Sequence, residues 1–162
     1  MAHEVLNIKD TLPLPYNIID AGAFKLNYVG LKSGQSEELV HDYGVMGDFS
    51  IELYDEKGIE ISEVCDATVG EVYSFYKELE EMMKDIKGSA TFFGFDINIV
   101  FTAKRTGIIE VEGVYTPYYR GIVTELKFRF ETEPTVIDNS LKRFKTLYGS
   151  LAELQGGYDF VL

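Results

Sequence analysis

The chain has little of what disulfide, metal or nucleophilic chemistry requires. Among its 162 residues it has one cysteine, two histidines and no tryptophan. A single cysteine, Cys65, excludes an intramolecular disulfide and fits a reducing compartment, where packing alone holds a small domain together. A zinc site needs several fixed ligands, whereas His3 lies at the start of the chain and His41 in a predicted loop. A nucleophilic Cys65 would need His41 close to it in space. From these scarce residues we expect no catalytic residues, no metal and no cofactor.

Motifs for nucleotides and membranes are absent as well. The sequence has no G-x-G-x-x-G or Walker pattern, and Gly107, Gly113 and Gly121 fit turns and bulges at strand ends. The N-terminus lacks a basic start followed by an apolar stretch, and no run of about 18 apolar residues occurs. We therefore expect no nucleotide site, no membrane contact and a cytoplasmic location.

Positive charge is scarce. Lysine and arginine number 15 against 27 aspartates and glutamates, which gives a net charge of −12. A field of this sign repels phosphate backbones and anionic lipids, so direct binding of nucleic acid is not expected. The same field steers a basic protein onto the chain and raises the rate of association. Solubility alone is the competing explanation of the charge.

What the chain has in quantity is apolar and aromatic surface. Hydrophobic residues make up 46% of the sequence, with 11 phenylalanines and 11 tyrosines, too many for a disordered acidic tail. A domain of about this size buries roughly two-thirds of its unfolded surface, so a real core is expected. No internal repeat, low-complexity segment or linker divides the chain, and residues 1–162 are predicted to form a single domain.

The beginning of the chain predicts little regular structure. Residues 1–23 contain Pro13 and Pro15 and lack a sustained period. This composition indicates an irregular N-terminal arm, with one edge strand expected near Val5–Ile8.

Strands are predicted next. Apolar residues alternate from Phe24 and predict a strand, and the mixture of glycines and charges over 30–48 predicts a long loop. Alternation over 49–54 and again over 59–61, around turn-forming residues, predicts a hairpin.

A helix is predicted between Thr68 and Gly88. Thr68 and Glu71 have the spacing of a capping box, worth about 1 kcal/mol, and Gly88 is suited to end the helix. The apolar residues at spacings of three and four form one stripe: Val72, Phe75, Tyr76, Leu79, Met83 and Ile86. The opposite face carries Lys77, Glu78, Glu80, Glu81 and Asp85.

A meander of three or four strands follows the helix. Residues 97–103 alternate, and a three-residue turn at 105–107 leads into a strand that pairs with them. The register that sets Ala103 opposite Ile109 keeps one face apolar, because it also sets Phe101 opposite Val111.

The meander continues after Val114 with a second hairpin. Residues 122–130 alternate, with charged residues on the outer face. We expect Glu112 to face Lys127 and Glu110 to face Arg129, each pair contributing roughly a few tenths of a kcal/mol at an exposed site.

A second helix is predicted from Thr135, where Thr135 and Asp138 repeat the capping spacing just after Pro134. Gly149 is expected to end it, and residues 150–162 to form a C-terminal tail. Its buried stripe consists of Ile137, Leu141, Phe144 and Tyr148.

Together these elements predict an α+β fold of two layers. One antiparallel sheet of about six strands, in the order hairpin, helix, meander, helix, is expected to carry both helices on one face. The apolar stripes of the two helices and the apolar face of the sheet are then expected to bury each other.

Two surface features suggest recognition of a partner. Glu78, Glu81 and Asp85 form an acidic helix face, although such a face is usually only solvated. Tyr115, Tyr118 and Tyr119 crowd a hairpin connection with Arg120, and tyrosine and arginine are the residues that anchor protein interfaces. Tyrosines folded over a sheet edge explain the second feature equally well.

The segments FYKELEEMMKDIKGSATF, RTGIIEVEGVY and ELKFRFETEPTVIDNSLKRF, with the element order over 49–149, resemble the WapI-type immunity proteins, a family of small bacterial proteins. The resemblance is carried by Leu79, Gly88, Ala90, Gly107, Val111, Gly113, Leu126, Phe128, Phe130, Thr135 and Leu141. It implies a cytoplasmic antitoxin that binds and blocks the C-terminal toxin domain of a polymorphic system, often an RNA-degrading domain.

The leading hypothesis is therefore a binding protein without catalysis, whose partner is a basic toxin domain. A small-ligand-binding or regulatory domain is the first alternative, and it requires a deep apolar pocket between sheet and helices. A hydrolase that uses buried carboxylates is the second, and it requires two acidic groups in one cleft with perturbed ionisation.

Overall fold

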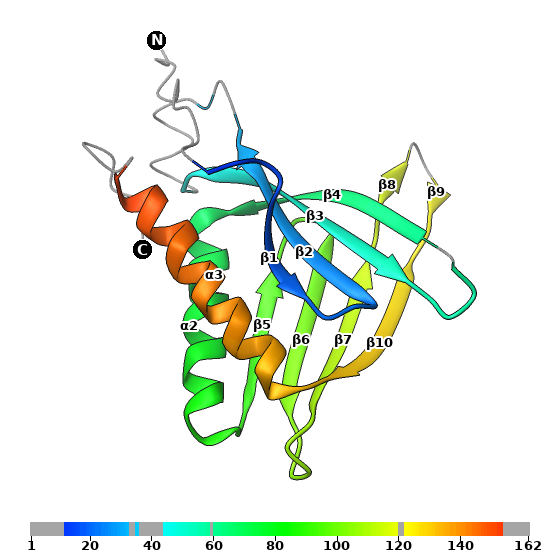
Figure 1. Cartoon of the computed structure of the whole chain (residues 1–162). Helices are drawn as coiled ribbons and strands as arrows, with labels where there is room; N and C mark the ends of the chain where they lie inside the picture. The colour runs from blue at the N-terminus through cyan, green and yellow to red at the C-terminus, as the bar shows by residue number, and fades with distance from the viewer. Residues whose placement is uncertain (1–11, 33–34, 36–43, 59, 120–121, 154–162) are drawn as a thin grey trace.

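The computed structural model of the chain describes residues 12–32, 35, 44–58, 60–119 and 122–153. These residues form two four-stranded antiparallel sheets, a small two-stranded ladder and two helices. Figure 1 shows the two helices side by side along one flank of the sheets. The edge strand expected near Val5–Ile8 lies outside the described residues.

The first sheet has the strand order β1-β2-β3-β4. Its strands are β1 (Tyr16–Asp20), β2 (Phe24–Leu31), β3 (Met46–Tyr54) and β4 (Glu60–Thr68). The strand from Phe24 and the following hairpin are thus confirmed, whereas β1 falls inside the segment predicted to be irregular. A cis peptide bond precedes Pro15, and the chain then pairs with β2 over only a few residues, too few to show a period in the sequence.

The second sheet has the order β10-β7-β6-β5. Its strands are β5 (Ser89–Phe93), β6 (Ile97–Ala103), β7 (Ile109–Tyr115) and β10 (Leu126–Thr132), and the ladder between β7 and β10 is formed by β8 (Tyr118–Tyr119) and β9 (Ile122–Val123). The predicted register of β6 and β7 is confirmed, since Ala103 lies opposite Ile109 and Phe101 opposite Val111.

The predicted register of β7 and β10 is wrong by two residues. Arg129 lies opposite Glu112, and Lys127 lies opposite Val114. Both registers turn the same face of β10 inward, because they differ by two residues. The observed one sets Phe128 opposite Gly113, where the missing side chain leaves room for the ring. Arg129 nevertheless reaches Glu110 diagonally, with an Nη2–Oε2 distance of 2.5 Å.

Helix α2 (Val69–Asp85) begins where the sequence predicted. Thr68 is the N-cap, and its hydroxyl accepts a hydrogen bond from the backbone N–H of Glu71 at 3.1 Å. The helix ends before Gly88, because Ile86 already has a left-handed φ of 49° and forms the C-cap. Ile86 is consequently 39% exposed, not part of the buried stripe.

Helix α3 (Pro134–Glu153) begins one residue before Thr135 and continues through Gly149, so the predicted end is wrong. Leu147, Tyr148 and Leu151 are buried on both sides of this glycine. A glycine inside a helix costs about 1 kcal/mol, which the packing of these side chains outweighs.

The prediction of one six-stranded sheet with both helices on one face is wrong, although the α+β class is confirmed. The sheets face each other, since the Phe24 ring lies 5.4 Å from that of Phe130 and the Phe49 ring 6.0 Å from that of Phe92. Helix α2 carries the chain from β4 in one sheet to β5 in the other, which the alternation pattern cannot reveal (Figure 1).

Aromatic rings fill the space between sheets and helices. Phe75 of α2 contacts the rings of Phe92, Phe101 and Phe144 at centroid distances of 5.3–5.8 Å. All four side chains are at most 1% exposed. A small-ligand-binding domain would need a deep pocket between sheet and helices. In the described part of the chain this space is closely packed with aromatic rings.

Candidate functional site

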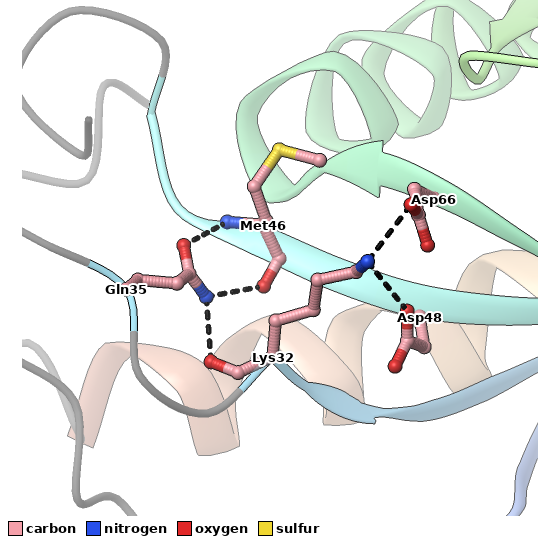
Figure 2. A network of polar contacts seen from close by, with 5 residues as sticks. All are labelled: Lys32, Gln35, Met46, Asp48 and Asp66. Carbon is pink, nitrogen blue, oxygen red and sulfur yellow. Dashed lines mark hydrogen bonds and ion pairs between the residues drawn. The ribbon is translucent and has the colours of Figure 1, made fainter.

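A lysine held by two aspartates lies on the outer face of the first sheet (Figure 2). Asp48 and Asp66 are directly opposite each other in β3 and β4, and Lys32 directly follows β2. The Nζ atom of Lys32 lies 2.8 Å from Asp66 Oδ2 and 3.8 Å from Asp48 Oδ1. Because one lysine neutralises only one of two carboxylates, the cluster keeps a negative charge above the pKa values of both.

The two aspartates respond to this arrangement in opposite directions. Burial raises the pKa of Asp48, and a hydrogen bond with Asp66 raises it further against the charge of Lys32. Burial acts in the same direction on Asp66, but hydrogen bonds with Lys32 and Asp48 outweigh it and lower the pKa. Because the two carboxyl groups interact directly, they titrate as a pair.

The side chain of Gln35 bonds to the backbone of Lys32, next to this cluster. Its amide group donates to the carbonyl oxygens of Lys32 and Met46, each at 2.8 Å, and accepts from the Met46 N–H at 2.7 Å (Figure 2). The side chain is only 7% exposed. The side chain therefore connects the end of β2 to the beginning of β3 and holds Lys32 close to Asp48.

The turn between β5 and β6 lies against this end of β4. The Phe95 N–H donates to the Asp66 carbonyl oxygen at 2.9 Å, and the Thr116 N–H to the Asp96 carbonyl oxygen at 2.8 Å. A Cβ atom on Gly94 would lie 3.1 Å from the Asp66 carbonyl oxygen and 2.8 Å from Ile97 Cγ2, so this approach requires glycine. The turn thus joins the ends of both sheets.

The outer side of this turn carries two exposed aromatic rings beside a hollow. Phe93 is 52% and Phe95 69% exposed. The hollow, which we call the hairpin hollow, has a volume of about 400 Å³. Its lining includes Phe93, Phe95, Asp96, Asn98, Val114 and Thr116. Large exposed rings on a folded chain are unusual, and they gather at interaction sites more often than elsewhere.

Carboxylates from three segments surround the same point of β4. Burial raises the pKa of the Cys65 thiol to about 12, and the charges of Asp66, Asp96 and Asp48 add to the effect. The thiol therefore stays protonated, and Cys65 is fully buried, which removes it as a nucleophile. His41, its expected partner, lies outside the described residues.

The residues of the predicted acidic helix face have different local contacts. Glu78 Oε2 accepts the Thr91 N–H at 2.8 Å, so this side chain binds the free edge of β5. Glu81 forms an exposed ion pair with Lys84, whose Nζ lies 2.6 Å away. Asp85 is the exposed last residue of α2. A role of this face in binding stays a prediction.

The predicted tyrosine loop is divided between core and surface. Tyr115 is 5% exposed and donates its hydroxyl to Glu63 Oε2 at 3.3 Å. Tyr118 and Tyr119 form β8, and their side chains lie outside what the structure describes. Tyr115 lies opposite Ile97 at one end of the sheet, whereas Asp85 precedes β5 at the other end, so the two predicted features do not form one surface.

The sequence indicated neither the hairpin hollow nor the Lys32 cluster. Phe93 and Phe95 stand at alternate positions and resemble core residues of a strand. In the structure Ala90 and Phe92 form the buried face of β5, Phe93 lies on the outward face, and Phe95 lies in the turn that follows. Lys32 and Asp48 lie at the two ends of a segment predicted to be a loop, while Asp66 was in no predicted element. Gly94, next to two phenylalanines, was the one available sign of a turn.

Neither metal nor paired-acid chemistry finds support in the described residues. No group of three or more His, Cys, Asp or Glu is placed there to hold a metal ion. The Asp48–Asp66 pair lies on an outward sheet face with side chains 34% and 40% exposed, bridged by a lysine. A hydrolase would instead hold such a pair in a cleft that excludes water.

The fold and this site define an α+β protein of two facing antiparallel sheets, with aspartates and two exposed phenylalanine rings gathered at one end. The chain belongs to the immunity protein WapI-like family, whose model matches residues 17–149. No curated protein matches its sequence. A solved structure, from the crystal structures of Trypanosoma brucei MRP1/MRP2, is similar at 12% identity with a TM-score of 0.45, covering 90% of this chain and 88% of that chain. None of the described helices is long and apolar enough to cross a membrane.

Proposed function

We propose that this chain is a cytoplasmic immunity protein that binds a cognate toxin domain and blocks it without catalysis of its own. The family match over residues 17–149 carries the proposal, since immunity is the function that the family description states. The partner is a basic domain, and a nuclease fits best because nucleases are cationic where they hold nucleic acid.

Charge supports a basic partner. The net charge of −12 steers a cationic protein toward the chain and raises its association rate. The same field acts against contact with the negatively charged substrate of a nuclease, so inhibition proceeds through the toxin and not through its nucleic acid.

The acidic helix face and the tyrosine loop remain proposed contact residues. Glu81 and Asp85 are exposed on α2 and free of the core, so a partner can approach them. Tyr118 and Tyr119 belong to a ladder that extends beyond the second sheet. These contacts lie on surfaces other than the hairpin hollow.

The test is protection in cells together with binding of purified proteins. The probe is the C-terminal domain of the polymorphic-toxin gene adjacent to this one in the source genome. Co-expression with this chain is expected to restore growth of cells that produce the domain, and the two proteins to elute as one complex. A chain that neither protects nor binds, or a genome without such a neighbouring gene, would contradict the proposed function.

A matched control separates inhibition from general acidity. A core-disrupted variant, Phe75→Asp, keeps an acidic composition but places an unpaired charge where the ring is fully buried. It is expected to lose protection. Protection by this variant at the wild-type level would mean that acidity alone accounts for the effect.

A further inference from the structure

The hairpin hollow combines two exposed rings with a carboxylate. Phe93, Phe95 and Asp96 all line it, on one short turn. Within the described part of the chain, no lysine or arginine pairs with Asp96. A hollow with aromatic walls and one uncompensated negative charge has the chemistry that recognises a cation on an apolar stem.

The neighbouring charges favour a cation over a neutral group. Asp48 and Asp66 lie on the other side of the same turn, which is bonded to Asp66 through the Phe95 N–H. Lys32 neutralises one of these two carboxylates. The end of the molecule around Asp96 therefore has a negative potential, which raises the local concentration of cationic groups.

We propose that the hairpin hollow receives an arginine or lysine side chain of the basic toxin domain, which stacks on Phe93 and Phe95 and pairs with Asp96. This inference rests on the proposed function and names the surface that performs it. Arginine is the better occupant, because its planar guanidinium both stacks on a ring and binds a carboxylate with two hydrogen bonds.

The turn is suited to be an anchor because it is rigid. Its backbone is bonded to β4 through Phe95, to β7 through Thr116 and internally from the Gly94 N–H to the Ile97 carbonyl oxygen. A side chain that binds here meets a backbone that is already held in place, so little backbone entropy is lost on binding. Residues of this kind dominate the affinity of protein interfaces.

The experiment measures the dissociation constant of the toxin domain named above for three single variants, Phe93→Ala, Phe95→Ala and Asp96→Asn. Each is expected to weaken binding at least tenfold. Asp96→Asn is also expected to flatten the dependence of affinity on salt, because it removes a charge and keeps the shape. The double variant Phe95→Ala/Asp96→Asn is expected to lose less than the product of the single losses, because both residues hold one partner side chain.

Two controls keep the outcome specific. Glu56→Gln changes one exposed acid in the turn between β3 and β4, and Asp138→Asn changes one exposed acid on α3. Both variants are expected to bind within about twofold of wild type. Because Phe95 is 69% exposed, its removal leaves the core intact, which the thermal midpoint of each variant checks.

The possible failures are distinct. If the wild-type chain neither binds nor protects, the proposed function fails and this inference fails with it. If wild type binds and the three hollow variants bind within about twofold of it, only this inference is overturned. If wild type alone sediments as a dimer that Phe95→Ala dissociates, the hollow is a contact between copies and the inference is overturned.

Discussion

At the scale of single residues, Gly113 shows why one position in β7 must have no side chain. It lies opposite Phe128 of β10, and the Phe128 ring covers its Cα. A Cβ atom built on Gly113 would lie 2.0 Å from Phe128 Cζ. An aromatic ring placed over a glycine in a neighbouring strand protects the backbone there and packs the sheet face.

We predict that Gly113→Ala destabilises the chain by roughly 1–3 kcal/mol, because the ring of Phe128 has to move out of its packed position. Denaturant unfolding of the two proteins measures the difference. Gly149→Ala is the matched control: nothing lies within 4 Å of its added Cβ, and alanine inside α3 is expected to stabilise by about 0.5–1 kcal/mol. Equal effects of the two substitutions would contradict the argument.

Cys65 gives a second prediction at this scale. Its thiol is fully buried, and burial together with the surrounding carboxylates raises its pKa to about 12. Since the thiolate is the reactive form, the native protein is expected to resist labelling by a disulfide reagent at pH 8. The unfolded protein is expected to be labelled at roughly the rate of free cysteine. Labelling of native protein as fast as free cysteine would show that the thiol is accessible.

At the scale of elements, Gln35 strengthens the pairing of β2 with β3 at the end of β2 and the start of β3. The Met46 carbonyl also accepts the Lys32 N–H at 3.0 Å and keeps that bond in Gln35→Ala. The substitution removes the partners of the Met46 N–H and the Lys32 carbonyl. We predict a loss of roughly 1–3 kcal/mol in unfolding free energy, because these groups are then left without their bonds. Gln35→Glu keeps the acceptor but not the two donor bonds, and it is expected to fall between wild type and alanine.

The pairing of β7 with β10 predicts a dependence on pH. The hydrogen bond from Arg129 lowers the pKa of Glu110, and Lys104 lowers it further. A carboxyl with a lowered pKa in the folded state stabilises above its unfolded value of 4.5, and this stability is lost as the pH falls through the folded value. Glu110→Gln is therefore expected to destabilise more at pH 7 than at about pH 3.

Unfolding midpoints of wild type and variant at the two pH values make the comparison. Glu112→Gln changes the same charge in the same strand, at a side chain that is 59% exposed and 3.6 Å from Arg129 Nε. A smaller and less pH-dependent effect is expected there. An effect of Glu110→Gln that is constant with pH would exclude the ion pair as its cause.

Elements with a long period could be predicted from the sequence, and short ones could not. The Thr68 cap, the stripe of α2 and the register of β6 with β7 follow from local spacing. The predicted register of β10 was wrong because exposed charges were used to set it, whereas the fit of the Phe128 ring over Gly113 favours the observed one. The end of α3 failed because a single glycine was given more weight than the packing beyond it.

At the scale of the whole molecule, the division into two sheets was beyond the sequence. Each strand shows one apolar face, but alternation does not say whether that face meets a helix or another sheet. The contacts of Phe24 with Phe128 and Phe130 join residues more than a hundred positions apart. For the same reason the site was missed, because its aromatic turn and its aspartates come from different sheets.

The net charge gives a prediction for association. With −12 on the chain, association with the basic toxin domain is expected to slow several-fold between about 0.05 M and 0.5 M salt, while the dissociation rate changes less. Reversing the charge of Glu81 and Asp85 to lysine is expected to slow association and to flatten its salt dependence, since both are exposed on α2. Stopped-flow mixing measures both rates, and an association rate independent of salt would exclude steering.

The bond between the Phe95 N–H and the Asp66 carbonyl has a consequence for how this chain can be shortened. It places the aromatic turn and the aspartate pair together only after both sheets have formed. A synthetic peptide that copies the turn would lack the carboxylates and the rigid backbone, and a chain still emerging from the ribosome would lack β10. Only a folded chain that contains both sheets presents the whole surface.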